Sequence, residues 1–249
     1  MTKDYISLDV ETTGLDPVKD RLLEIGAVKV TGGAVRETYS TLIDTKFPVP
    51  FRIQELTGIT DEMRRTGKEA ADAMREFLAF CGGLPVVGHN IPFDFGFLKQ
   101  TAYEAGLSFE AEGLDTLKIA RKLLPEMPSR TLTALCSHYK IDPGNAHRAL
   151  SDAKAAHELL NCLWKEFGEQ DPEAFRLQTL IYKAKKQSPI TNSQKGYLKD
   201  LIKYHKIEMN IQTNELTKRE ASRLIDQIIL QYGRIMRPDR KEGCNGFLQ

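Results

Sequence analysis

The segment YISLDVETTG, residues 5–14, joins a short apolar strand to two acidic side chains. Tyr5 to Val10 has the length and the residue types of a buried strand. Asp9 and Glu11 stand two residues apart, so strand alternation sends both carboxylates to one face and the apolar side chains to the other. Two carboxylates this close repel each other unless a cation lies between them or one takes up a proton. Taken alone, the pair also fits a strand that ends in solvent.

Strands and helices follow this segment in an order typical of an α/β fold. Two more strands are expected at Arg21–Val30 and Glu37–Ile43, joined by a turn at Gly32-Gly33. Short strands at 85–87 and 113–115 then alternate with helices. The expected helices lie at about 69–81, 93–105, 116–124, 132–139 and 149–167. Three strands followed by alternating helices and strands predict a mixed sheet covered by helices.

The chain after Gly168 has a different character. A helix is expected at about 173–185, and two capping boxes follow, Thr191-x-x-Gln194 and Thr217-x-x-Glu220. Each box opens a helix with apolar residues at helical spacing. We therefore predict an α/β domain at residues 1–170, a linker helix at 171–189, a basic helical module at 190–236 and a flexible tail at 237–249.

The composition predicts a soluble globular protein. Of the 249 residues, 41% are hydrophobic and 28% are charged. The N-terminus lacks the basic and apolar regions of a secretory signal, and no stretch approaches the roughly 20 apolar residues that cross a bilayer. The four cysteines are scattered without CxxC spacing, so we expect reduced thiols. These features predict a cytoplasmic protein with no membrane contact.

The net charge of +1 conceals an uneven distribution. Residues 183–249 carry 14 lysines and arginines against 7 acidic residues, whereas residues 1–182 carry 21 basic and 27 acidic residues. A basic tail on an acidic body hints at contact with nucleic acid, although a solvated surface has the same composition. Candidates for phosphate contact follow helical spacing: Lys195, Lys199, Lys203 and Lys206.

More acidic residues and a histidine lie at helix starts. Asp94 falls in the first turn of a helix that begins directly after a strand, within VVGHNIPFDFGFL. Strand ends are where α/β folds bind ligands, but an acidic residue there also complements the helix dipole. His147 stands on a loop, and Asp152 lies in the first or second turn of the next helix with its carboxylate expected to face the sheet. A histidine titrates close to neutral pH and can take a proton from water.

Together, Asp9-x-Glu11, Asp94 and His147-x4-Asp152 resemble the DEDDh family of 3′–5′ exonucleases, which includes the epsilon proofreading subunit of bacterial replicative DNA polymerase. The resemblance covers roughly residues 5–163 and rests on three motifs in the family's order, SLDVETTG, GHNIPFDFGFL and HRALSDA. Position 148 is arginine, so the variant of the family with YxxxD in place of HxxxxD is not supported. The resemblance implies a ribonuclease-H-like fold, which agrees with the expected mixed sheet.

The resemblance also implies a mechanism. Two divalent cations would be held by Asp9, Glu11, Asp94 and Asp152, and hard oxygen ligands select Mg²⁺ or Mn²⁺. One cation would lower the pKa of the attacking water, with His147 as the general base, and the other would stabilise the leaving 3′ oxygen. By the same resemblance, the backbone around Thr12 and Thr13 would hold the terminal 3′-hydroxyl. Gly58 and Ile59 would contact the last base, with Ile59 as an apolar wedge, and Asn90 and Phe93 would line the pocket of the terminal nucleotide.

Several of these positions also have structural interpretations. Ile59 fits a core position equally well, and Asn90 fits a turn. Two further acidic residues, Glu24 and Asp115, are interpreted as structural, the first through a hydrogen bond and the second as a helix cap.

The expected function is metal-dependent 3′–5′ release of nucleotide monophosphates from single-stranded or frayed DNA ends, as in proofreading or repair. An RNA exonuclease on the same scaffold is an alternative, because nothing in the motifs distinguishes the 2′-hydroxyl. A non-catalytic protein that tethers a polymerase is disfavoured, because all five catalytic-type residues are present. The expected partner is a DNA polymerase or another replication protein.

Overall fold

The computed structural model describes residues 1–208, 213 and 216–235. The chain divides into two compact units between Lys186 and Gln187. The first unit carries the sheet and every candidate catalytic residue, and the described residues of the second form two helices. The flexible tail expected at 237–249 lies outside the described residues.

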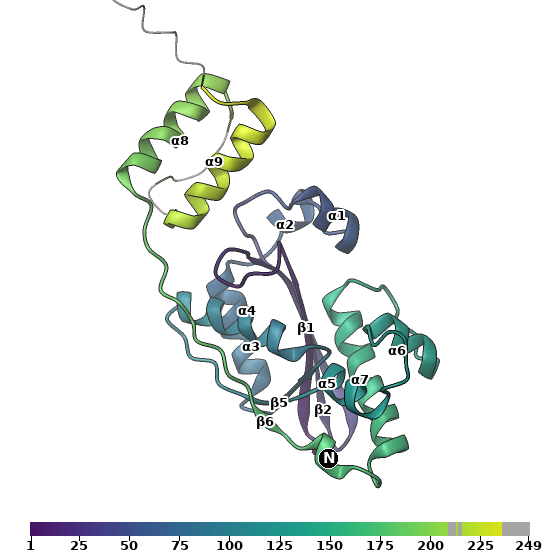
Figure 1. Ribbon diagram of the computed structural model, residues 1–249. Coiled ribbons are helices and arrows are strands. Elements are labelled where there is room, and N and C mark those ends of the chain that lie inside the picture. Colours follow the sequence, from purple (N-terminus) through teal and green to yellow (C-terminus); the bar gives the residue numbers. More distant parts are fainter. Residues whose placement is uncertain (209–212, 214–215, 236–249) are drawn as a thin grey trace, which may run out of the picture. The chain divides into compact units, whose positions relative to one another are not determined.

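A mixed sheet forms the centre of the first unit, with six strands among the residues that the structure describes (Figure 1). They are β1 (Tyr5–Thr12), β2 (Leu22–Thr31), β3 (Ala34–Leu42), β4 (Val86–Gly88), β5 (Glu112–Asp115) and β6 (Gln178–Thr179), in the order β3-β2-β1-β4-β5-β6. β1, β4 and β5 run parallel, whereas β2, β3 and β6 pair antiparallel with their neighbours. The carboxyl ends of the parallel strands therefore meet at one edge of the sheet.

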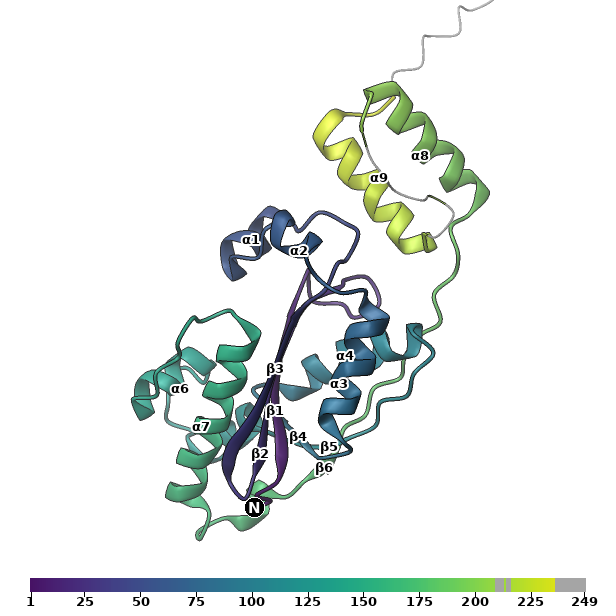
Figure 2. The ribbon, with the colours of Figure 1, turned by 180° about the vertical axis from the view of Figure 1, so that it is seen from behind.

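Helices cover both faces of this sheet (Figure 2). One face packs against α3 (Ala70–Cys81) and α4 (Ile91–Glu104), and the other against α5 (Thr116–Leu123), α6 (Leu132–Tyr139) and α7 (Ala149–Phe167). Each face has its own cluster of buried apolar side chains. This layered arrangement confirms the mixed sheet with flanking helices that the sequence predicted.

Local sequence signals account for most of these bounds. Gly32 and Gly33 have φ of 62° and 83°, which matches the hairpin turn expected between β2 and β3. From residue 5 to residue 167 the expected strands and helices fall within three residues of the observed ones. Two short helices were not expected, α1 (Phe51–Thr57) and α2 (Asp61–Arg65), which connect β3 to α3.

The linker helix expected at 171–189 is wrong. This segment forms a 3₁₀ helix, η1 (Pro172–Phe175), then β6 and an extended chain. Long-range contacts override the local pattern: β6 pairs with β5, and Leu180 is buried in the core. The Gln100 side chain also bonds both backbone groups of Lys185 at 2.9 Å. The first unit therefore extends to Lys186, beyond the boundary predicted at residue 170.

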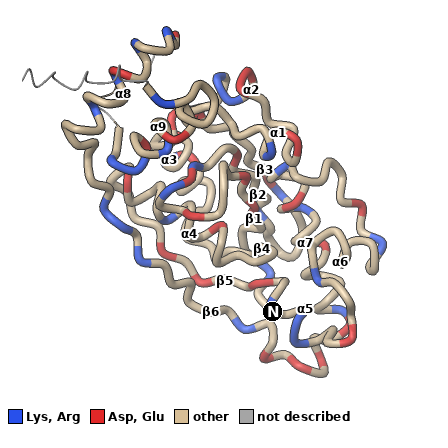
Figure 3. The backbone as a smooth tube through the Cα atoms, turned by 45° about the horizontal axis from the view of Figure 1, so that its top comes forward, with Lys and Arg blue, Asp and Glu red and all other residues tan. Residues whose placement is uncertain are grey.

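The second unit contains α8 (Asn192–His205) and α9 (Lys218–Tyr232), and both expected capping boxes are present. Apolar side chains that are buried in this unit come from both helices: Leu198, Leu201, Ala221, Leu224, Ile225 and Ile228. Lysines and arginines occur along both helices (Figure 3). No helix in the described part of the chain is long and apolar enough to span a membrane.

Candidate active site

One face of β1 lies along α7, and this contact places the acidic residues of both elements side by side. The Tyr5 hydroxyl bonds the Nδ1 atom of His157 at 2.9 Å. One step along the same face, the Ser7 hydroxyl donates to the Ala153 carbonyl at 2.7 Å. These bonds hold α7 against the strand, so that Asp152 lies beside the acidic end of β1. His157 is thereby a structural residue.

A glycine in β2 allows the close approach of α7. Gly26 lies opposite Asp9 in the β1–β2 register. A Cβ atom at this position would come within 2.1 Å of the backbone of Ala149 and Leu150, nearer than any side chain can pack. The first turn of α7 therefore rests directly on the backbone of β2.

Three carboxylates converge where β1 and α7 meet. Asp9, Glu11 and Asp152 each offer one oxygen atom, and these oxygens all lie within 4.8 Å of one another. All three side chains are partly buried. A set of hard oxygen ligands at this spacing fits Mg²⁺ or Mn²⁺. The structure thus brings together three of the four ligands that the sequence predicted.

The cluster is electrostatically strained without a cation. Burial raises the pKa of Asp9 well above its ordinary value, and the charges of Asp94, Glu11 and Asp152 raise it further. Burial, followed by the Asp152 and Glu24 charges, raises the pKa of Glu11 to about 8, against an opposing effect of Arg148. Such shifts arise because like charges lie together in a poorly solvated space. A divalent cation bound there would offset their repulsion.

Asp94 lies next to this cluster but outside the group of three. Its side chain is only 3% exposed, and its Oδ1 atom accepts the Val10 backbone N–H at 3.0 Å. Burial raises the pKa of Asp94, against the effect of that hydrogen bond. Asp94 stands in the first turn of α4, as expected, and its charge acts on Asp9. Its role as a cation ligand stays a prediction.

His147 stands on the exposed loop that enters α7, as the sequence predicted. Its φ of 61° lies in the left-handed region, which is uncommon for residues other than glycine. Its backbone N–H donates to Asp152 Oδ2 at 3.1 Å. The candidate base is therefore tied through its backbone to a candidate cation ligand, while its ring remains exposed.

The threonines after β1 shape the loop at the edge of the cluster. The Thr12 hydroxyl donates to the Gly14 carbonyl at 2.7 Å, and the Thr13 hydroxyl accepts the Arg21 backbone N–H at 2.9 Å. Both side chains are thus occupied in holding the loop. The Thr13 backbone N–H also donates to the Arg21 carbonyl at 2.9 Å, and the backbone contact to the substrate that the resemblance implied stays a prediction.

Gly58 and Ile59, the predicted contacts to the last base, differ in their surroundings, because Gly58 lies at a helix end and Ile59 lies in the core. Gly58 ends α1 with a left-handed φ of 70°. Ile59 is fully buried in a small core with Leu23 and Val49. In this conformation Ile59 cannot act as a wedge against a base. Ile59 is therefore a core residue, the second of the two interpretations that the sequence allowed.

Asn90 and Phe93 border the start of α4. Asn90 is exposed with a left-handed φ of 73°, and its backbone N–H donates to Asp115 Oδ1 at 2.9 Å. Asp115 also caps α5, which confirms its structural interpretation. Phe93 is half-buried against Phe97, with 5.0 Å between the ring centroids. Asn90 and Phe93 both remain available at the surface beside Asp94.

The sequence interpretation missed one feature of the site, the ion pair between Glu24 and Arg148. Arg148 donates to Glu24 through Nε at 3.0 Å and through Nη2 at 2.8 Å. Glu24 is a structural acceptor, as expected, and lies outside the group of three carboxylates. The partner is separated from it by 124 residues, so no local spacing reveals the pair.

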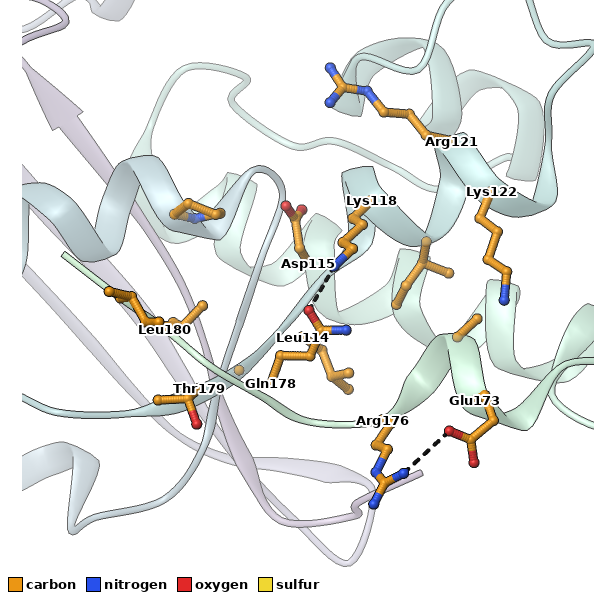
Figure 4. A pocket seen from close by; sticks show the side chains of 15 residues that line it. Leu114, Asp115, Lys118, Arg121, Lys122, Glu173, Arg176, Gln178, Thr179 and Leu180 are labelled. Atoms are coloured by element: carbon orange, nitrogen blue, oxygen red, sulfur yellow. Dashed lines mark hydrogen bonds and ion pairs between the residues drawn. The ribbon is translucent and has the colours of Figure 1, made fainter.

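A separate pocket of about 660 Å³ lies between α5, η1 and β6 (Figure 4). Four cationic side chains line it: Lys118, Arg121, Lys122 and Arg176. Three of these four pair within the chain, with Gln178, Asp171 and Glu173. None of the clustered carboxylates lines this pocket. We therefore place the chemistry at the acidic cluster and not in the pocket.

Residues 6–160 match a family model described as Exonuclease, RNase_T. The chain belongs to this exonuclease family. The match spans all three sequence motifs, and the resemblance that they carried is confirmed at the level of the family.

Curated relatives agree with this assignment. The DNA polymerase III subunit epsilon of Aquifex aeolicus is 35% identical over 172 residues, which cover 67% of this exonuclease-family chain and 85% of that protein. The PolC-type DNA polymerase III of Lacticaseibacillus paracasei is 40% identical over 164 residues, which cover 66% of this chain and 11% of that protein. The chain thus spans about a tenth of the length of its PolC-type relatives.

Solved structures share the fold. Exonuclease I of E. coli in complex with a dT13 oligonucleotide superposes with a TM-score of 0.60 at 21% identity, over 70% of this chain and 43% of that one. Exonuclease X in complex with 5′ overhanging duplex DNA superposes with a TM-score of 0.54 at 26% identity, over 66% of this chain and 92% of that one. The likeness to exonuclease I concerns the fold alone.

Proposed function

We propose that this exonuclease-family chain is a 3′–5′ exonuclease that releases nucleotide monophosphates from DNA ends. The observation that carries the proposal is the convergence of Asp9, Glu11 and Asp152, whose oxygens lie within 4.8 Å of one another at the carboxyl edge of the sheet. The names of the relatives and the DNA in the solved complex of exonuclease X support DNA as the substrate.

The residues present fit a pair of divalent cations, because a cation would relieve the mutual repulsion that raises the carboxyl pKa values. Asp9, Glu11 and Asp152, with Asp94 beside them, would hold Mg²⁺ or Mn²⁺. Bound there, the cations would lower the pKa of the attacking water and stabilise the leaving 3′ oxygen.

The chain's own residues supply the proton transfer and the positioning. His147, exposed on its loop beside Asp152, takes the proton of the attacking water as general base. The backbone at Thr12 and Thr13 holds the terminal 3′-hydroxyl, and Asn90 and Phe93 border the terminal nucleotide. Ile59 has no part in this arrangement, because it is buried.

Digestion of labelled oligonucleotides tests the proposal. We expect DNA labelled at its 5′ end to shorten stepwise in Mg²⁺, and DNA labelled at its 3′ end to release labelled mononucleotide at once. Asp152→Ala is the inactive control. Release that starts from the 5′ end, or no release in Mg²⁺ or Mn²⁺, would contradict the proposal. A matched RNA oligonucleotide degraded faster than DNA would move the substrate to RNA.

We also infer a replicative polymerase as partner, supported by relatives that are named as DNA polymerase III or its subunit epsilon. Co-purification of the full chain with the polymerase from the same organism tests this inference. Separate elution of the two at micromolar concentration would contradict it.

A further inference from the structure

A carboxylate from β2 caps the helix that carries Asp152. Glu24 accepts three hydrogen bonds, two from the Arg148 guanidinium and one from the Ala149 backbone N–H at 3.1 Å. Ala149 is the first residue of α7, and its N-cap residue Arg148 supplies no side-chain cap of its own. Glu24 is 2% exposed and the Arg148 side chain is 35% exposed, so the carboxylate is buried while the guanidinium keeps contact with water. The paired, forked geometry is the strongest that an arginine and a carboxylate form.

Two contacts restrain the backbone around His147. Its left-handed backbone is a costly conformation, which persists only where neighbouring contacts fix it. On one side its N–H is held by Asp152, and on the other side its successor Arg148 is held by Glu24. Asp152, by contrast, lies on a helix that is anchored independently by the bond from Ser7 to Ala153.

We propose that the Glu24–Arg148 pair is a positioning device that fixes the loop of His147 for general-base catalysis. The inference rests on the proposed exonuclease function. Arg148 is not among the proposed cation ligands, and it acts on the reaction through its neighbour in the chain. Removing the forked contact should free the backbone at His147 while the cation ligands keep their places.

A second explanation would give Arg148 a purely electrostatic role. Its positive charge acts on Glu11 as well as on Glu24. Lysine keeps that charge but lacks the planar fork, so Arg148→Lys separates the two explanations. Arg130 provides the matched control, because its Nε and Nη2 atoms both donate to the Leu124 carbonyl, at 3.1 and 2.8 Å, away from the cluster.

The experiment measures kcat and KM of the full chain on a short oligothymidylate in Mn²⁺. We expect Arg148→Lys to lower kcat by about 10- to 100-fold, the scale of a small misplacement of a catalytic group, with KM and calorimetric Mn²⁺ affinity nearly unchanged. Arg130→Lys should keep the wild-type kcat even where its melting temperature falls. Glu24→Gln gives an independent test and should lower kcat in the same way, because it removes the charge that holds the fork.

A double-mutant cycle with His147→Ala decides how Arg148 acts. If Arg148 works through His147, then Arg148→Lys causes little further loss in the His147→Ala background. The same fold loss in both backgrounds, or wild-type kcat in both Arg148→Lys and Glu24→Gln, would overturn the inference. Those results differ from failure of the proposed function, in which the wild-type chain itself would not degrade the oligonucleotide.

Discussion

Replacing Glu11 by glutamine should stabilise the protein in the absence of divalent cations, although it removes a proposed cation ligand. Glutamine keeps the size of the side chain and cannot ionise. In the folded protein Glu11 faces Asp152 and lies opposite Glu24 in the β1–β2 register, so its charge is poorly accommodated. The substitution removes that charge together with the repulsion that it causes.

The sign and the size of the effect follow from the pKa of Glu11. The pKa rises from 4.5 to about 8 on folding. Between these values the folded state keeps a proton that the unfolded state has lost, so the wild-type protein loses stability as the pH rises. At 1.36 kcal/mol per tenfold change in proton affinity, the full shift amounts to about 5 kcal/mol. Because solvent reaches this partly buried side chain, we expect about half of that, ~2–3 kcal/mol.

Thermal unfolding of both proteins in EDTA, from pH 4 to pH 9, measures this difference. The two melting temperatures should coincide near pH 4 and separate by about 5–10 °C above pH 8. Saturating Mn²⁺ at pH 8 should raise the wild-type value more than the variant's, because binding to the folded state stabilises it. Glu112→Gln, which removes an exposed carboxylate from β5, should change neither curve. A Glu11→Gln protein no more stable than wild type at pH 8 would refute the reasoning.

Three further predictions concern the site and the second unit. His147→Ala should lower kcat by roughly 10²–10⁴-fold with calorimetric Mn²⁺ binding nearly unchanged, whereas a collapse of Mn²⁺ affinity would make His147 a ligand. Asp9→Ala and Asp152→Ala should abolish turnover and weaken Mn²⁺ binding while the circular dichroism of the fold survives; wild-type-like activity in either would contradict their assignment. Truncation after Lys186 should leave an active nuclease on very short DNA, with a shallower salt dependence of binding to long DNA.

The sequence predicted those parts of the fold that local signals specify. Strand alternation in β1 predicted that Asp9 and Glu11 share one face, and in the structure that face meets α7. The capping boxes at Thr191 and Thr217 marked the starts of α8 and α9. The segment at 173–185 shows the limit of such signals. The helical pattern of this segment is overridden by its pairing with β5 and by its hydrogen bonds with Gln100. Neither interaction can be inferred from the sequence of the segment alone.

The same distinction applies to the site. The motifs located Asp9, Glu11 and Asp152, because each stands at a recognisable strand end or helix start. Ile59 was ambiguous in the sequence, since its burial depends on packing against residues far away in the chain. The pair of Glu24 and Arg148 was out of reach, because the contact crosses 124 residues. Arg148 lies within the motif HRALSDA, but nothing in that motif indicates Glu24 as its partner.

Truncation after Lys186 separates two kinds of substrate binding that depend on opposite charges. The first unit offers acidic groups to a phosphodiester, so its binding should require divalent cations. The removed segment contains 11 of the 14 basic residues counted from Lys183 onward, since Lys183, Lys185 and Lys186 remain. These residues need no cation to bind phosphate, so the full chain should bind long single-stranded DNA in EDTA and the truncated chain should not.

The salt dependence gives the number of contacts. Each phosphate contact on a single strand contributes about 0.7 to the slope of log K against log salt, so four contacts, from Lys195, Lys199 and Lys203 of α8 and from Lys206 at its end, would change the slope by about 3. Equal slopes for the full and truncated chains would mean that these lysines are only solvated, and binding to a partner protein would become the better explanation of the second unit. An insoluble truncated chain would instead mean that the second unit covers apolar surface of the first. A shallower slope in the truncated chain, together with equal turnover of very short DNA by both chains, would mean that the basic helices bind substrate. The chemistry would then belong to the acidic cluster.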